Sequence, residues 1–107
     1  MRYISPKAKL TLREVFLEGD LVILGPTLVG AGTRLGFNTL IGYPRRVKLR
    51  GLKPSASEHP VSLDRVSSGS EIGERCVIRS STTIYEGAVL SDGVSTGHGV
   101  LIREASR

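Results

Sequence analysis

Aliphatic residues recur along this chain at a strict spacing of six. The spacing runs from Leu17 to Ile41 and resumes from Ile72 to Ile102. Eleven positions follow it: Leu17, Ile23, Val29, Leu35, Ile41, Ile72, Ile78, Ile84, Leu90, Thr96 and Ile102. Ten of them are Ile, Leu or Val, although these types make up 30 of the 107 residues and chance would place only about three there. This repeat constrains the fold more than any other feature of the sequence.

The other positions of each six-residue unit are patterned as well. Apart from Leu21, small or β-branched residues stand four positions after the aliphatic residue, at Thr27, Thr33, Thr39, Cys76, Thr82, Ala88, Val94, Val100 and Ser106. Gly, Asn or Asp stands three positions after it at Asp20, Gly32, Asn38, Gly87, Gly93 and Gly99. Gly follows it directly at Gly30, Gly36, Gly42, Gly73 and Gly97. Since these residue types adopt positive φ at little cost, a turn is expected in every unit.

The pattern predicts an all-β chain wound as a triangular prism, with three units to a coil. Each aliphatic side chain points inward and stacks on its equivalent in the next coil, so apolar burial grows with every coil. A 3.6-residue helical period does not match a spacing of six. A β-sandwich or hairpin barrel remains the alternative, although hairpins favour a period of two. Ile4, Ala8 and Leu10 indicate an irregular earlier coil, whose register slips by one residue before Leu17.

The repeat is interrupted between Ile41 and Ile72. These residues are 31 positions apart, which is five units plus one residue, and the intervening segment contains three prolines and several serines. We expect a loop insertion at about residues 43–71, extruded from a corner of the prism and either functional or a flexible excursion with a solvated basic face. Residues 45–53 account for the whole net charge of +5, because the other ten basic residues of the chain balance its ten acidic ones. This stretch has five basic residues and no acidic residue: Arg45, Arg46, Lys48, Arg50 and Lys53.

Length and composition indicate a single domain over residues 1–107. Charged residues are scattered through the first twenty positions, which therefore hold neither a signal peptide nor a membrane span, and the cytoplasm is the expected location. The last unit reaches the final residue with nothing to cover it. An open solenoid end exposes unpaired backbone groups, so we expect a fragment of a longer protein or an end buried in a homo-oligomer.

Two stretches of the repeat resemble hexapeptide-repeat acyltransferases, most closely those that N-acetylate nucleotide-linked amino sugars. They are residues 29–44 (VGAGTRLGFNTLIGYP) and residues 78–104 (IRSSTTIYEGAVLSDGVSTGHGVLIRE). The resemblance implies a left-handed parallel β-helix and a homotrimer with active sites between neighbouring chains. It also implies acetyl-coenzyme A as co-substrate and transfer of acetyl to an amine or hydroxyl of a nucleotide-linked sugar. Family members usually continue through further coils, so this chain matches their N-terminal part only.

The resemblance also implies roles for particular residues. In many such enzymes a histidine removes the acceptor's proton, and His98 stands at an outward turn position suited to a general base. Tyr85, Glu86, Arg103 and Glu104 occupy outward positions just after an interior aliphatic residue, where stacking, hydrogen bonds and bidentate contacts to a substrate are possible. Each of these residues is otherwise an ordinary surface residue.

The basic insertion is the part of the chain where phosphate contacts are expected. Arg45, Arg46 and Lys48 could bind the diphosphate of a nucleotide sugar or the phosphates of coenzyme A, although no Gly-rich phosphate motif accompanies them. Nucleic-acid binding by this stretch is disfavoured, because it has no aromatic residue for stacking.

Two other functions remain open. A truncated or non-catalytic β-helix could act only in assembly through its open end. A zinc enzyme of the β-helix carbonic anhydrase type needs three histidines, and the chain has only His59 and His98, so no metal site is predicted.

Overall fold

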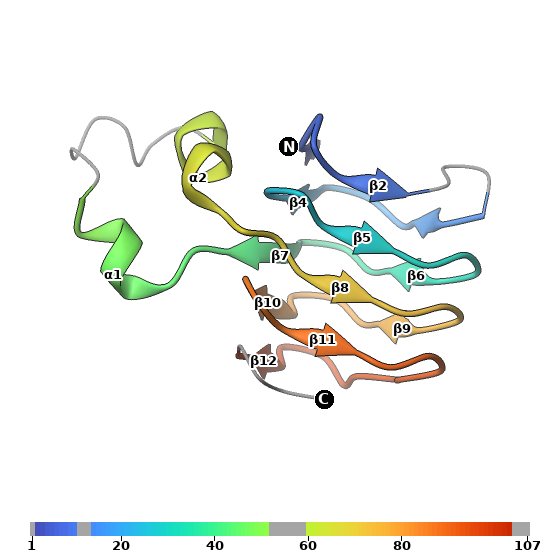
Figure 1. The fold of residues 1–107 in the computed structure, drawn as a ribbon. Helices are drawn as coiled ribbons and strands as arrows, with labels where there is room; N and C mark the ends of the chain where they lie inside the picture. Colours follow the sequence, from blue (N-terminus) through green and yellow to red (C-terminus); the bar gives the residue numbers. More distant parts are fainter. Residues whose placement is uncertain (1, 11–13, 52–59, 104–107) are drawn as a thin grey trace.

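Short parallel strands make up most of the computed structural model, which describes residues 2–10, 14–51 and 60–103. The chain visits three sheets in turn (Figure 1). Sheet A is ordered β1 (Arg2–Ile4), β4 (Leu21–Ile23), β7 (Thr39–Tyr43), β10 (Thr83–Tyr85) and β12 (Leu101–Ile102). Sheet B is ordered β11 (Val89–Leu90), β8 (Glu71–Ile72), β5 (Leu28–Val29) and β2 (Lys9–Leu10). Sheet C is ordered β3 (Phe16–Leu17), β6 (Arg34–Leu35) and β9 (Val77–Ile78), and an isolated parallel bridge joins Val77 to Ser95.

The pairing register repeats every 18 residues, as in Phe16↔Arg34, Leu21↔Thr39 and Thr83↔Leu101. Three six-residue units therefore make one coil, and every strand pair in the described part of the chain is parallel. This confirms the predicted all-β coil of parallel sheets. It also rules out the sandwich and the hairpin barrel, whose neighbouring strands are antiparallel.

The first coil shows the expected slip. β1 and β2 pair with residues 19 positions later, as in Ile4↔Ile23 and Leu10↔Val29, whereas Leu17 pairs with Leu35, 18 positions later. One extra residue therefore lies between Leu10 and Leu17. The irregular earlier coil inferred from Ile4, Ala8 and Leu10 is confirmed, and these side chains pack against the core.

The repeating aliphatic residues form the core. Ile23, Leu35, Ile41, Ile78 and Ile84 have no exposed surface. The narrower positions are equally buried, although most of them are threonines: Thr27, Thr33, Thr39, Cys76, Thr82 and Ala88. Each of these threonine hydroxyls donates to a backbone carbonyl, at 2.8 to 3.2 Å, so no buried hydroxyl among them lacks a partner.

Some of the threonines also join successive coils. The Oγ1 atom of Thr27 accepts the N–H of Ser70, and that of Thr33 accepts the N–H of Cys76. Thr33 donates in return to the carbonyl of Gly73 at 2.8 Å. The inward threonines therefore act as cross-links between coils as well as small core residues.

Glycine has two different uses in the turns. The position three after the aliphatic residue takes positive φ at Gly32, Asn38, Gly87, Gly93 and Gly99, as predicted, but not at Asp20. Arg75 and Ser81 take the same conformation. At Gly30 and Gly36, which directly follow an aliphatic residue, glycine is needed for space. A Cβ atom at Gly30 would lie 2.6 Å from backbone atoms of the next coil, and one at Gly36 would lie 2.7 Å away.

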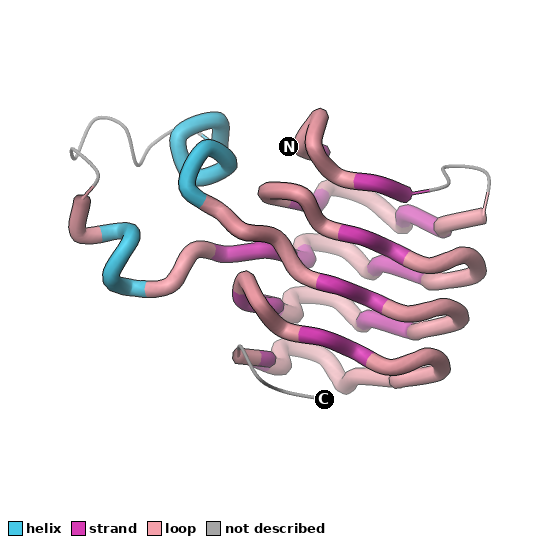
Figure 2. The backbone as a smooth tube through the Cα atoms, in the orientation of Figure 1, coloured by secondary structure: helices cyan, strands magenta, loops and turns pink. Residues whose placement is uncertain are grey.

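The insertion begins after Tyr43 and rejoins the coil at Glu71, close to the predicted bounds. Across it the register is 43 rather than 18, as in Leu28↔Glu71, so it adds 25 residues to one coil. It contains two short helices that its irregular sequence did not predict, α1 (Arg46–Leu49) and α2 (Pro60–Val66). In Figures 1 and 2 α1 projects away from the coil, while α2 lies beside the N-terminal coils.

Asp64 anchors α2 to the N-terminal coils. Its buried Oδ1 accepts the N–H of Gly25 at 2.6 Å, and Oδ2 accepts the hydroxyl of Tyr3 at 2.9 Å. Burial on its own would raise the pKa of the Asp64 carboxyl, but hydrogen bonds from Ser5, Gly25 and Tyr3 outweigh it and lower the pKa. Neither helix in the described ranges is long and apolar enough to cross a membrane.

Candidate functional site

The predicted site residues lie at two different corners of the prism. His98 belongs to the turn that leads from sheet C into β12 of sheet A. Tyr85 ends β10 of sheet A, and Glu86 begins the next turn, toward sheet B. The two groups therefore stand at opposite ends of the sheet A strands.

Hydrogen bonds with the preceding coil hold the His98 turn in place. The N–H of Arg79 donates to Thr96 Oγ1 at 3.0 Å, and Thr82 Oγ1 donates to the carbonyl of Gly97 at 3.2 Å. On the other side of His98, the N–H of Gly99 donates to the carbonyl of Ser80 at 2.9 Å. The turn is therefore supported on both sides of the histidine, although the imidazole itself is exposed.

The imidazole is held by a side chain of the same preceding coil. His98 Nδ1 lies 2.7 Å from Ser80 Oγ, within hydrogen-bond distance. Both residues line a pocket of about 310 Å³ together with Glu18, Arg34, Val77, Ile78 and Arg79. With Nδ1 engaged by Ser80, Nε2 is the ring nitrogen left to exchange a proton with a bound molecule.

Two arginines and one glutamate are among the residues that line the pocket. Arg34 pairs with Glu18 at 3.4 Å, and its guanidinium carbon lies 5.1 Å from the centre of the Phe16 ring. Arg79 lines the same pocket. Two arginines in the lining of a pocket that also holds an imidazole suit a bound molecule that carries negative charge or develops it on an oxygen atom.

Tyr85 and Arg103 come together at the other corner. The guanidinium carbon of Arg103 lies 4.9 Å from the centre of the Tyr85 ring, and the ring of Tyr43 meets that of Tyr85 edge-on at 5.5 Å and 81°. Tyr85 is half-buried, whereas Arg103 is exposed. Substrate binding by this pair stays a prediction. Glu104, like His59, falls outside the described residues.

Glu86 differs from the outward, solvent-facing position expected for it. Its side chain is 2% exposed, because the insertion passes over it. The two carboxylate oxygens accept the N–H groups of Arg45 and Ser68, the Nε of Arg45 and the Nζ of Lys48, at 2.7 to 3.1 Å. Burial raises the pKa of the Glu86 carboxyl, but these donors outweigh it and lower the pKa from 4.5 to about 2.

Two of the three residues predicted to bind phosphate, Arg45 and Lys48, pair with Glu86 instead. Lys48 Nζ also donates to the carbonyl of Val66 and to Ser68 Oγ, both at 2.8 Å, so all three of its protons have acceptors. Arg45 pairs with Glu86, while Arg46 is exposed. Phosphate binding by these residues stays a prediction, and for Lys48 it would require breaking three contacts.

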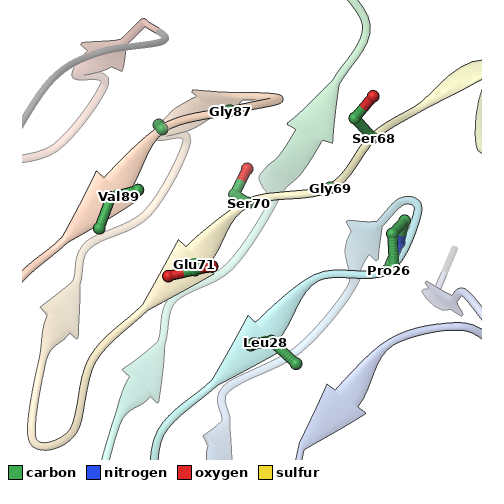
Figure 3. A pocket seen from close by; sticks show the side chains of 9 residues that line it. Pro26, Leu28, Ser68, Gly69, Ser70, Glu71, Gly87 and Val89 are labelled. Atoms are coloured by element: carbon green, nitrogen blue, oxygen red, sulfur yellow. The ribbon is translucent and has the colours of Figure 1, made fainter.

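A second pocket, of about 190 Å³, lies where the insertion rejoins sheet B (Figure 3). Leu28, Glu71 and Val89 line it from the adjacent strands β5, β8 and β11. Residues of three chain segments at the corner complete it, namely Pro26, Ser68, Gly69, Ser70, Gly87 and Ala88. Nothing in the sequence indicated this pocket, because the N–H of Gly87 reaches the carbonyl of Gly69 only once the insertion has folded back.

By contrast, the residues around His98 carry a usable sequence signal. Ser80 precedes His98 by 18 positions, which is one full coil. Aligning sequence positions that are 18 residues apart would have predicted that the two side chains lie close together.

Among the residues that the structure describes, no three His, Cys, Asp or Glu side chains gather closely enough to hold a metal ion. Comparison with known proteins finds no matching family model, curated protein or solved structure.

Proposed function

We propose that this chain is an acetyltransferase of the hexapeptide-repeat type, located in the cytoplasm and wound as a left-handed coil. Its co-substrate is acetyl-coenzyme A, and its acceptor is an amino or hydroxyl group of a nucleotide-linked sugar. The observation that carries the proposal is His98, an exposed imidazole on a supported turn in a pocket lined by two arginines. The 18-residue parallel coil and the resemblance of its repeat units to such enzymes support it.

The residues of the pocket suit direct acyl transfer. Nε2 of His98 accepts a proton from the acceptor's amine or hydroxyl as that group attacks the thioester carbonyl. A carbon–nitrogen or carbon–oxygen bond forms, the carbon–sulfur bond breaks, and the departing thiolate takes up a proton. Arg34 and Arg79 stabilise negative charge, either on a phosphate of a bound molecule or on the carbonyl oxygen during attack.

A homotrimer is part of the same proposal. Large apolar side chains are half-exposed on the outside of the coil: Phe16, Leu28, Phe37 and Leu101, with exposed fractions of 42 to 53%. Their burial against neighbouring chains would remove apolar surface from water, which favours association. Arg34 lines the His98 pocket and contacts the ring of Phe16, so a neighbouring chain packed against Phe16 would help to enclose the pocket.

The first experiment measures binding and transfer on the same sample. Calorimetry should show saturable binding of acetyl-coenzyme A, and a thiol assay should detect free coenzyme A when an amino-sugar nucleotide is added. His98→Ala should bind acetyl-coenzyme A as the wild type does but transfer at least about a hundredfold more slowly, because it lacks the general base. His59→Ala is the matched control and should keep the wild-type rate. Equal rates for wild type and His98→Ala would remove His98 from the mechanism.

The alternative is a β-helix that acts only in assembly, and the exposed apolar side chains on the coil favour it. A well-folded oligomer that binds no acetyl-coenzyme A would support this alternative and reject the transferase.

A further inference from the structure

Ser80 and His98 occupy equivalent places in successive coils. They are 18 residues apart, and the backbone contact between Gly99 and Ser80 fixes the spacing of the two coils at this point. Ser80 Oγ lies 2.7 Å from His98 Nδ1. The backbone that carries the two side chains cannot shift here without breaking the hydrogen bond between Gly99 and Ser80. The pairing follows from the register of the coil, and it does not depend on a flexible loop.

Within residues 2–10, 14–51 and 60–103, Ser80 is the only side chain that hydrogen-bonds the His98 ring. A serine hydroxyl can both donate and accept, and a neutral imidazole carries its proton on one of two nitrogens. If the hydroxyl donates, Nδ1 is unprotonated and Nε2 carries the proton. If the hydroxyl accepts, Nδ1 carries the proton and Nε2 presents a free lone pair to the pocket.

Only the second arrangement suits a general base whose outward nitrogen is Nε2. We propose that Ser80 is a positioning residue that accepts a hydrogen bond from Nδ1 of His98 and so holds the imidazole with an unprotonated Nε2 facing the pocket. The inference rests on the proposed function, since it assumes that His98 removes a proton from the acceptor. Ser80 itself forms no bond to substrate in this scheme.

The protonation state of the ring can be tested without any enzyme assay. Long-range proton–nitrogen spectra of the full chain at about pH 8.5, where an ordinary histidine is neutral, distinguish protonated from unprotonated ring nitrogens. Spectra of His59→Gln identify the His98 signals. The wild type should show the proton mainly on Nδ1, Ser80→Ala should shift it toward Nε2, and Ser80→Thr, which keeps a hydroxyl, should resemble the wild type.

The inference is overturned if wild-type His98 carries its proton on Nε2, or if Ser80→Ala leaves the distribution unchanged. Unaltered circular dichroism and melting temperature of the two variants serve as the folding check. Ser80→Ala is isosteric apart from the hydroxyl, and Ser80→Thr provides a second route if its extra methyl group is accommodated.

Kinetics separate this inference from the proposed function. Ser80→Ala should lower kcat about tenfold with little change in KM for acetyl-coenzyme A, because the bound state is intact while the base is misoriented. Ser80→Thr should recover most of the rate. Loss of activity in His98→Ala with full activity in Ser80→Ala would overturn the positioning role alone. Absence of transfer in the wild type would reject the function, while the spectra would still decide how Ser80 and His98 share their proton.

Discussion

Glu86 shows how one residue can fasten the insertion to the coil. A buried carboxylate is costly unless its oxygens are fully hydrogen-bonded. Here the donors come from both ends of the insertion, Arg45 and Lys48 near its start and Ser68 near its end. The side chain therefore holds the two points where the chain leaves and re-enters the coil.

This arrangement predicts an acid-sensitive contribution to stability. The folded-state pKa of Glu86 is lowered from 4.5 to about 2, so the contribution is complete above pH 4.5 and is lost as the pH falls toward 2. Between about pH 7 and pH 2.5, the free energy of unfolding of the wild type should fall by up to about 3 kcal/mol more than that of Glu86→Gln, as measured by urea unfolding. At neutral pH the variant should be less stable than the wild type by about 2 kcal/mol.

Glu74→Gln is the matched control for this titration, because it removes an exposed carboxylate whose one ion pair within the described residues is with its neighbour Arg75. It should leave the wild-type pH dependence in place. Parallel curves for the wild type and Glu86→Gln would mean that the buried carboxylate does not titrate in this window.

At the scale of the strands and turns, the close approach of successive coils is the limiting feature. Gly30 follows the core residue Val29 and lies against the backbone of Gly73 and Glu74 in the next coil. A methyl group there would lie 2.6 Å from backbone atoms, which cannot rotate away as a side chain can. The glycine is therefore required by the spacing between coils.

Gly30→Ala should lower the free energy of unfolding by roughly 2 kcal/mol, within the range seen for overpacked sites. Gly97→Ala is the matched control, since its added methyl group would meet only Val100 Cγ2, at 3.7 Å. That variant should lie within about 0.5 kcal/mol of the wild type or above it, because alanine restricts the unfolded chain. Chemical unfolding of the two variants, measured side by side, checks the difference. Equal losses would show that the coils can move apart at Gly30.

The strands and turns of the repeat were predictable, because a short sequence period sets which positions face the core and which form the turns. The positions of Ile41, Thr39 and Asn38 as core, narrow core and turn follow from the spacing of six alone. The helices of the insertion and the burial of Glu86 were not predictable, because both depend on contacts between distant residues, such as Asp64 with Gly25. At the candidate site, the exposed turn of His98 was within reach of the sequence, whereas Arg34 acquires its place only through stacking of the coils.

At the scale of the whole molecule, the insertion is an addition to a coil that is otherwise continuous. Removing residues 44–68 would join Tyr43 to Gly69 and restore the spacing of six between Ile41 and Ile72. The shortened turn would then match the uninterrupted turn from Ile84 to Leu90. The pairs Leu28↔Glu71 and Leu40↔Thr83 could form with the register of 18 found elsewhere.

The shortened chain should therefore keep a cooperative β-sheet transition but melt at a lower temperature than the wild type. It loses the contacts of Asp64 with Tyr3 and Gly25, while Glu86 loses Arg45 and Lys48 but becomes accessible to water. Circular dichroism melting checks this. Deletion of residues 52–76 is the control of equal length, and it should melt at a lower temperature than the chain lacking residues 44–68, because it removes Ile72 and Cys76 from the core. If the chain lacking residues 44–68 failed to fold, the insertion would have to be part of the folding unit, and the coil could not be treated as the independent scaffold of the His98 pocket.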